Sequence, residues 1–392
     1  MTIILFDTPQ ARKSFYPFTL TRPIADIRQG ILTIKERWAL LTEQKIGVLT
    51  EPYLQQVLPQ DDDFVYVDAT LVPTKDLLDT IFSMEKASVW MEGDQVVAYR
   101  TQDELTFPVT SADAFPINPA VLIKRFRYPW QLFQTNEQAI KGDFGLLTHD
   151  GTSQAIDKTN IVFNESNIFI EEGAEVRACT INAEAGPVYI GKDALVMEGT
   201  TIRGPVAICN NAVVKMGSKL YPGTTIGPFC TAGGEIKNSI MMGYSNKAHD
   251  GYLGDSVIGE WCNMGAGTTN SNVKNTAGDV KMWSGAADDF VVVGKKAGLL
   301  MGDYSRAAIN TSFNTGTVVG LCCNVYGNGF PLKHTPSFTW GNDKYDLEKA
   351  LSDIDRWMQF KNKTITETEQ NIVRYLFEKG DADQDESNLT LL

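Results

Sequence analysis

The sequence predicts a parallel β-helix preceded by an α/β domain and followed by two helices. Aliphatic residues recur at every sixth position in the middle of the chain: Ile190, Val196, Ile202, Ile208, Val214, Leu220 and Ile226. An α-helix repeats near every 3.6 residues and a strand every two, whereas a period of six over seven steps is typical of a parallel β-helix. The alternative, a β-sandwich with spaced strands, would show polar and apolar residues in alternation, which this segment does not.

Three such hexapeptides make one turn of 18 residues, so interior side chains should stack on those one turn before and after. Gly191, Gly227 and Gly259 each follow an interior aliphatic residue, where we expect the backbone to turn a corner with little room for a Cβ atom. The ladder resumes with a shift of two residues at Ile240, Asn246, Tyr252, Ile258 and Met264. This shift predicts a small bulge or loop leaving the coil between about 236 and 250.

An α/β unit is expected at residues 1–150, before the solenoid. The apolar runs at 2–6, 45–50 and 63–72 predict short buried strands, and residues 25–41 have helical spacing. Alternation of strands and helices favours a mostly parallel sheet.

The solenoid is expected over residues 155–335, and two helices over 344–380. An apolar stripe at helical spacing marks the first helix, at Leu347, Leu351, Ile354 and Met358. Thr366 with Glu369 three residues later is a capping-box pattern, which predicts the start of a second helix ending near Gly380.

The composition of the chain indicates which binding partners and which cellular location to expect. A net charge of −13 argues against nucleic acid or anionic lipid as a partner. The first residues contain no long apolar run, so we expect neither a signal peptide nor a membrane span, and a cytoplasmic location. The six cysteines show no CxxC spacing, so we expect buried residues or free thiols rather than disulfides or a zinc site.

One segment reverses the acidic balance. Between Arg203 and His249 there are five Lys or Arg residues and one acid, Glu235. Lys219 and Lys237 are 18 residues apart, one full turn, which predicts that they stack on the same side of the solenoid. A stacked lysine pair would clamp a phosphorylated small molecule; the alternative is two solvated lysines on a solenoid face.

His249 lies at the break in the ladder, in the segments KAHDGYLGD (247–255) and NMGAGT (263–268). A neutral imidazole can take a proton from an attacking amine near pH 7, although a lone histidine is more often structural. These segments resemble those of the acetyltransferase half of the bifunctional N-acetylglucosamine-phosphate uridyltransferase and glucosamine-phosphate acetyltransferase family, in which a left-handed β-helix carries them. This chain lacks the residue that the family has between the Ala and the His.

The resemblance implies a role for each matching residue. His249 would be the general base for a sugar amine, and the Ala266 amide would stabilise the oxyanion formed as the amine attacks acetyl-CoA. The implied substrate-binding residues are Lys219 and Lys237 at the phosphate, with Tyr252, Asn263 and Asn272 around the sugar. Because such solenoids assemble as trimers with sites between subunits, the resemblance also implies a homotrimer.

The N-terminal unit resembles the Rossmann-like domain of sugar-phosphate nucleotidyltransferases at RKSFYPFTLTRP (12–23) and VYVDATLVP (65–73). This resemblance implies phosphate contacts from Arg12, Lys13 and Arg22, and Mg²⁺ binding by Asp68. The family's Gly-rich phosphate loop is missing, since residues 7–23 contain no glycine. The unit is therefore either a divergent nucleotidyltransferase or a remnant without catalysis, and Asp68 either binds metal or caps a turn.

Three functions are compatible with these features. The favoured one is an acyltransferase, moving acetyl or another acyl group from acyl-CoA to the amine of an amino sugar phosphate or nucleotide sugar, in nucleotide-sugar and cell-envelope biosynthesis. The second is a sugar-1-phosphate nucleotidyltransferase that uses the β-helix for trimerisation. The third is a non-catalytic scaffold that binds sugar nucleotides.

Overall fold

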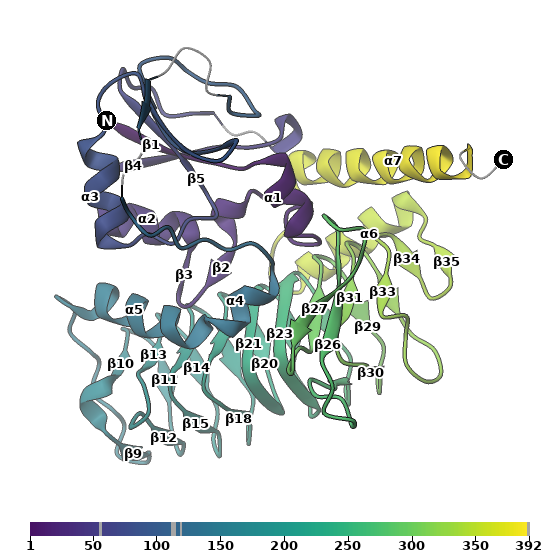
Figure 1. Ribbon diagram of the computed structural model, residues 1–392. Coiled ribbons are helices and arrows are strands. Elements are labelled where there is room, and N and C mark those ends of the chain that lie inside the picture. Colours follow the sequence, from purple (N-terminus) through teal and green to yellow (C-terminus); the bar gives the residue numbers. More distant parts are fainter. Residues whose placement is uncertain (55–56, 111–114, 118–119, 390–392) are drawn as a thin grey trace.

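The computed structural model describes residues 1–54, 57–110, 115–117 and 120–389, with side chains to Gly380 (Figure 1). An α/β domain lies against a parallel β-solenoid of about ten turns over residues 161–340, and two helices follow. The predicted combination of an α/β domain, a parallel β-helix and a helical tail is confirmed.

The α/β domain is built on one sheet with the order β4-β1-β5-β7-β6-β8. Its strands are β1 (Thr2–Phe6), β4 (Lys45–Leu49), β5 (Phe64–Asp68), β6 (Ser88–Glu92), β7 (Gln95–Thr101) and β8 (Phe115–Ile117). Its helices are α1 (Pro9–Ser14), α2 (Ile34–Thr42), α3 (Lys75–Ser83), α4 (Trp130–Gln134) and α5 (Asn136–Thr148). The centre is parallel, because β1 pairs with β4 and β5 in that sense, while β7 is antiparallel to both β5 and β6.

The predicted helix at 25–41 starts later than its spacing suggested. Residues before it form a short hairpin of β2 (Arg28–Gln29) and β3 (Leu32–Thr33). Helix α2 begins at Ile34 because Thr33 and Glu36 form a capping box, in which each side chain accepts a hydrogen bond from the other's backbone amide, at 3.2 and 2.6 Å.

The solenoid has three faces, each a stack of parallel strands except for the last strand of the second face, β35, which is antiparallel to β34. The first face holds β10 (Ile168–Ile170), β13 (Val188–Ile190), β16 (Val206–Ile208), β19 (Thr224–Ile226), the second halves of β21 (Glu235–Gly243) and β23 (Tyr252–Glu260), β28 (Leu299–Met301), β31 (Thr317–Val319) and β33 (His334–Thr335). The second face holds β11 (Glu175–Val176), β14 (Leu195–Val196), β17 (Val213–Val214), β20 (Thr231–Ala232), β22 (Asn246–Lys247), β24 (Asn263–Met264), β29 (Arg306–Ala307), β32 (Asn324–Val325), β34 (Thr339–Trp340) and β35 (Asp343–Lys344). The third face holds β9 (Ile161–Phe163), β12 (Thr180–Asn182), β15 (Thr201–Arg203), β18 (Lys219–Leu220), the first halves of β21 and β23, β25 (Thr269–Asn270) and β30 (Ser312–Phe313).

The six-residue ladder forms the solenoid interior, as predicted. All seven residues from Ile190 to Ile226 belong to one buried apolar cluster, and each is at most 2% exposed. The predicted crowding at the corners is also present, because a Cβ atom on Gly227 would collide with the backbone oxygens of Met241 and Met242 in the next turn. In each turn, one aliphatic side chain from each face therefore fills the interior, and glycine at the corner lets successive turns stack closely.

The register beyond Ala232 differs from the prediction. Only two residues, Gly233 and Gly234, separate β20 from β21, whereas four separate β17 from β18. The strand β21 then continues from the third face to the first without a break, so this turn is shorter than the turns before it and no loop leaves the coil.

This shortening changes which side chains point inward. The interior positions are Met241, Lys247 and Leu253, each at most 1% exposed, rather than Ile240, Asn246 and Tyr252. Ile258 and Met264 are interior as predicted. The real insertion comes later, as a hairpin of β26 (Val280–Ser284) and β27 (Asp289–Gly294) that the sequence did not predict.

The α/β domain covers the first face of the solenoid. Outward residues of that face, including Ile240, Met242 and Val257, join the main core of the α/β domain. Helix α5 lies along the earlier turns (Figure 1), where Ile140 packs with Tyr189. The shared core makes the first face an internal surface.

Two helices, α6 (Leu347–Gln359) and α7 (Glu367–Leu389), follow the solenoid. Three residues of the predicted stripe, Leu351, Ile354 and Met358, are buried in a cluster with solenoid residues such as Tyr304. The capping box of Thr366 and Glu369 is formed, but α7 continues beyond the predicted end at Gly380.

All six cysteines are buried and unpaired, as the absence of CxxC spacing predicted. Within the described ranges, none of the helices combines the length and the apolar character that a membrane span requires.

A buried ion-pair network joins the α/β domain to the solenoid. Arg22 donates to Asp303 at 2.6 Å and pairs with Glu260 at 3.2 Å. Arg22 is 8% and Asp303 1% exposed. Burial of the Glu260 carboxyl raises its pKa, which Arg22 opposes.

We expect Arg22→Ala to destabilise the protein by about 3–5 kcal/mol, since it leaves the buried Asp303 carboxylate without its cation. Chemical denaturation monitored by tryptophan fluorescence would measure the change. The matched control is Arg374→Ala, which removes an exposed pair with Glu348 and should leave the midpoint unchanged. Equal effects of both substitutions would contradict this prediction.

Candidate active site

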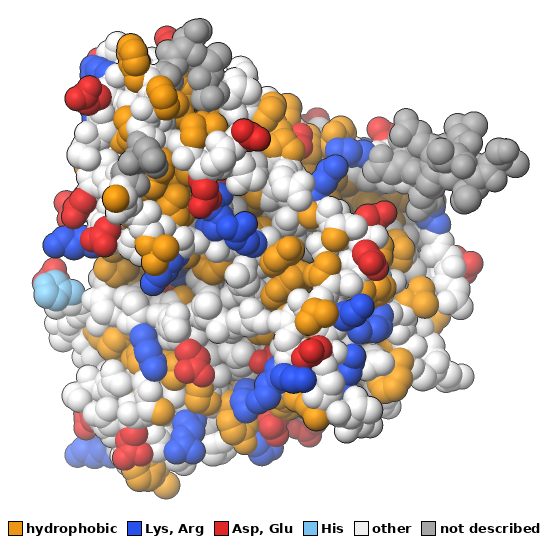
Figure 2. Space-filling view, viewed as in Figure 1, with side chains coloured by type: hydrophobic (Ala, Val, Ile, Leu, Met, Phe, Trp, Pro, Cys, Tyr) orange, Lys and Arg blue, Asp and Glu red, His pale blue; other side chains and the backbone are white. Residues whose placement is uncertain are grey.

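The second corner of the solenoid, between the second and third faces, lies away from the α/β domain, which covers the first face. His249 is exposed at this corner, and Lys219 and Lys237 are exposed on the third face. On the side of the molecule shown in Figure 2, Lys and Arg side chains are interspersed with Asp and Glu. His249 thus lies at a corner that is open to solvent, and the two lysines lie on the adjoining third face.

His249 and Ala266 occupy neighbouring turns at this corner. His249 lies between β22 and β23, and Ala266 lies between β24 and β25, one turn of the solenoid later. The two turns are joined by a 3.1 Å hydrogen bond from the Gly267 amide to the Asp250 carbonyl. The structure therefore brings together the residues for which the resemblance implied general-base and oxyanion roles.

Tyr252 and Asn272 meet on the third face, directly after this corner. The Asn272 amide donates to the Tyr252 hydroxyl at 3.1 Å and also to Asp255. The Asn238 amide donates to the other oxygen of Asp255 at 2.6 Å. Burial raises the pKa of Tyr252 to about 12, so its hydroxyl stays protonated and can donate near pH 7.

Sequence reasoning missed Asp255 and Asn238, which hold this network together. Asp255 is 5% exposed, and both residues have a positive φ, 48° and 46°. Asp and Asn adopt this conformation more readily than most residues. The YLGD sequence contains Asp255, but only the stacked turns bring Asn238 beside it.

The two lysines share a face but do not stack. Lys219 pairs in register with Glu235, not with Lys237, because the Gly233–Gly234 corner is two residues short. Lys237 lies two residues further along β21, beside Gly254. The predicted stack is therefore wrong, and Glu235 lies next to one of the two cations.

Asn263 opens β24 on the second face, near the same corner. It pairs in register with Asn246 on one side and Arg306 on the other. Of the predicted acyl-transfer residues, His249, Ala266 and Asn263 are thus grouped at the corner, and Tyr252, Asn272 and the two lysines lie on the third face.

The residues predicted to bind nucleotide phosphate are differently placed. The Arg12 guanidinium is buried and donates to Asp7 at 2.8 Å, to Thr50 at 2.9 Å and to Tyr53 at 3.0 Å. Arg22 belongs to the interdomain network described above. Lys13 is exposed. Arg12 and Arg22 thus have internal partners, and Lys13 is open to solvent.

Asp68 has partners that do not suit a metal ligand. Its carboxylate accepts from the Thr70 amide at 2.9 Å, which caps a turn, and pairs with Arg125 at 3.0 Å. Among the described residues, no three His, Cys, Asp or Glu side chains are placed to hold a metal ion. Because a cation already neutralises Asp68, this site does not fit Mg²⁺.

A cleft of about 850 Å³ separates α1 from the end of the solenoid and α7. Lys13, Tyr16 and His334 line it. The His334 ring stacks on Trp283 with centroids 4.3 Å apart and meets Tyr16 edge-on at 5.8 Å. The cleft lies at the carboxyl ends of β1 and β4, the edge at which parallel sheets bind ligands.

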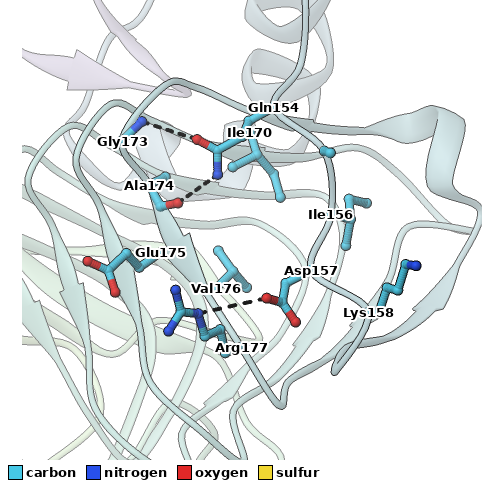
Figure 3. Close-up of a pocket in the computed structure, with 11 residues that line it drawn as sticks. Gln154, Ile156, Asp157, Lys158, Ile170, Gly173, Ala174, Glu175, Val176 and Arg177 are labelled. Carbon is cyan, nitrogen blue, oxygen red and sulfur yellow. Dashed lines mark hydrogen bonds and ion pairs between the residues drawn. The ribbon is translucent and has the colours of Figure 1, made fainter.

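A second hollow lies at the N-terminal end of the solenoid, and Gln154, Asp157 and Arg177 in its lining already have partners (Figure 3). The Gln154 side chain accepts from the Gly173 amide at 3.2 Å and donates to the Ala174 carbonyl at 3.0 Å. Asp157 pairs with Arg177 at 3.8 Å. This hollow lies away from the predicted site residues, so it is not our candidate site.

The chain combines an α/β domain with a parallel β-helix, and the α/β domain resembles sugar nucleotidyl transferases in sequence. Residues 3–152 match the family model described as sugar nucleotidyl transferase, which covers the α/β domain. The predicted resemblance to bifunctional sugar nucleotidyltransferase/acetyltransferase proteins is confirmed by the relatives that match this chain.

Two of these relatives are named as bifunctional proteins. The bifunctional protein GlmU of Synechococcus elongatus is 29% identical over 172 residues, covering 41% of this chain and 34% of its own. A bifunctional sugar-1-phosphate nucleotidylyltransferase/acetyltransferase of Sulfurisphaera tokodaii is 28% identical over 201 residues, or 50% of this chain and 43% of its own. The chain therefore spans less than half the length of these relatives.

Among solved structures, an Arabidopsis UDP-N-acetylglucosamine acyltransferase aligns at 13% identity with a TM-score of 0.21. The alignment covers 54% of this chain and 78% of that protein. The score is too low for this likeness to support any conclusion.

We expect stability to fall as the pH drops from about 6.5 towards 4, in part because of His334. Burial lowers the pKa of His334 to about 4 from the ordinary value of 6.5. The unfolded chain therefore takes up the proton first, which favours unfolding below pH 6.5.

When the pH is changed from 7 to 5, the thermal midpoint of the His334→Phe variant should fall by less than the thermal midpoint of the wild type. The control His149→Asn changes a side chain that is 84% exposed and should behave as the wild type. An identical loss in all three proteins would contradict the prediction.

Proposed function

We propose that this protein is an acyltransferase whose active site is the second corner of the solenoid. The observation that carries this proposal is the exposed His249, in a turn bonded to the turn of Ala266 and followed directly by the Tyr252–Asn272 pair. The names of the matched relatives, which include acetyltransferase activity, support the same reaction.

In the proposed reaction, the neutral His249 imidazole takes a proton from the amine of the acceptor as its nitrogen attacks the thioester carbon of acyl-CoA. The new C–N bond forms, and the oxyanion that develops accepts a hydrogen bond from the Ala266 amide. When the C–S bond breaks, the protonated imidazole returns its proton to the CoA sulfur. The products are the N-acylated acceptor and free CoA thiol.

The acceptor that we propose is an amino sugar carrying a phosphate, either free or within a nucleotide. Lys237 lies beside Gly254, about 7 Å along the strand direction from Tyr252, and Lys219 lies on the same face. Two exposed ammonium groups at that separation from the corner can hold a phosphate while the sugar reaches His249. Tyr252, Asn263 and Asn272 would then contact the sugar.

Acetyl-CoA as donor, a homotrimer and a cytoplasmic location complete this proposal. The second corner is open in a single chain, so a neighbouring subunit could supply the other wall of the site. The N-terminal domain would remain as a covering element of the first face.

We expect purified protein to release free thiol from acetyl-CoA in the presence of an amino sugar phosphate. His249→Ala should lower kcat by about 10²–10⁴-fold, the usual contribution of a general base. His149→Ala, at an exposed histidine outside the solenoid, is the control and should keep full activity. The background will be small because all six cysteines of the protein are buried.

Equal thiol release by both variants would exclude His249 as the base. If the wild type releases no thiol with any amino sugar phosphate or amino nucleotide sugar, the proposed reaction is wrong. Lys237→Ala separates binding from chemistry: it should raise KM for phosphorylated acceptors and leave kcat nearly unchanged.

The second candidate function is nucleotidyl transfer by the α/β domain. The family-model match and the cleft beside Lys13 favour it. The internal partners of Arg12 and the Arg125–Asp68 pair weigh against it. We therefore expect no pyrophosphate when the protein is incubated with Mg²⁺, nucleoside triphosphates and sugar 1-phosphates; sustained release that Lys13→Ala diminishes would establish this second function instead.

A further inference from the structure

Lys247 occupies a position in the solenoid interior. Its register neighbour in the preceding turn is Ala232, and the corresponding residue of β24 in the following turn is Met264, both in the apolar core. Lys247 is 1% exposed and ranks among the largest fully buried side chains. A lysine in an aliphatic ladder is costly, because burial disfavours the ammonium; here burial lowers the pKa of Lys247 to about 8, partly opposed by Asp250.

The ammonium group binds two backbone carbonyls of the second corner. Lys247 donates to the Gly233 carbonyl at 3.1 Å and to the His249 carbonyl at 2.8 Å. These two carbonyls belong to successive turns of the solenoid. The lysine thus ties the shortened Gly233–Gly234 corner to the turn that carries His249.

The same turn is held from two further sides. A Cβ atom on Gly234 would lie 2.7 Å from the Gly251 oxygen and 3.0 Å from the His249 oxygen, so the glycine corner packs directly against the turn. On the other side, the Gly267 amide donates to the Asp250 carbonyl at 3.1 Å. The backbone of the turn is fixed on both sides, while the His249 side chain remains exposed.

We propose that Lys247 is a positioning residue that orders the 248–251 turn and so directs the His249 imidazole toward the acceptor amine. This inference rests on the proposed function for the role of His249, but the ordering of the turn can be tested without any activity. A methionine at 247 would match the apolar residue of the next turn, yet it would leave the Gly233 and His249 carbonyls without their donor.

The first measurement is hydrogen–deuterium exchange of the full chain, followed on peptides that cover 248–251. We expect Lys247→Met to speed exchange in this turn by about tenfold, as local opening becomes easier. The control is Lys215→Met, at the same corner two turns earlier, which should leave that exchange unchanged. If Lys247→Met does not fold, Lys247→Gln retains two N–H donors and should give a smaller increase.

The second measurement is thiol release with acetyl-CoA and the acceptor. We expect Lys247→Met to lower kcat by roughly 10²-fold with KM for acetyl-CoA unchanged, because a displaced base affects the chemical step. Unchanged exchange in the 248–251 turn would overturn the inference, and so would faster exchange with an unchanged kcat. If the wild type itself releases no thiol, the proposed function fails, while the exchange data still decide whether Lys247 orders the turn.

Discussion

The stacking of one interior side chain per face on its counterpart in the next turn is the constraint on which this structure depends. Each interior residue from Ile190 to Ile226 is buried against residues one turn away, so the register of one turn determines the register of the next. A change in the length of a single corner is therefore transmitted to every face that follows.

That transmission accounts for the candidate site. The two-residue corner at Gly233–Gly234 moves Glu235 beside Lys219. The path of β21 from the third face to the first is shorter by one further residue, and together these changes bring Lys247 into the interior. The polar groups of the second corner then lie close together, with the ammonium of Lys247 beneath the turn and the His249 side chain outside it. At the break in the ladder, polar contacts thus replace the apolar packing of the interior. Departures of this kind from the local sequence pattern are often found at functional sites.

The α/β domain and the solenoid are held together by a shared core and a buried ion pair. The α/β domain covers the first face with a continuous core, and Arg22 pairs with Asp303 across the boundary. Arg22 therefore has a structural role in the boundary between the domains. Arg12 is also engaged in an internal ion pair, with Asp7. A domain that matches sugar nucleotidyl transferases in sequence thus uses Arg12 and Arg22 for internal contacts.

The sequence by itself determined the class of fold, because a period of six cannot be met by a helix or an ordinary strand, and the ladder from Ile190 to Ile226 is interior as predicted. It also located the 247–268 motif, because that motif is carried by local sequence; the structure places its His249 and Ala266 in successive turns. Only the tertiary structure decided the register beyond Ala232, because the length of a corner depends on how closely two turns approach and not on periodicity. For the same reason Ile240 faces the α/β domain, Lys247 faces inward and Asn238 meets Asp255: these contacts join residues from different turns or domains, and no local pattern records them.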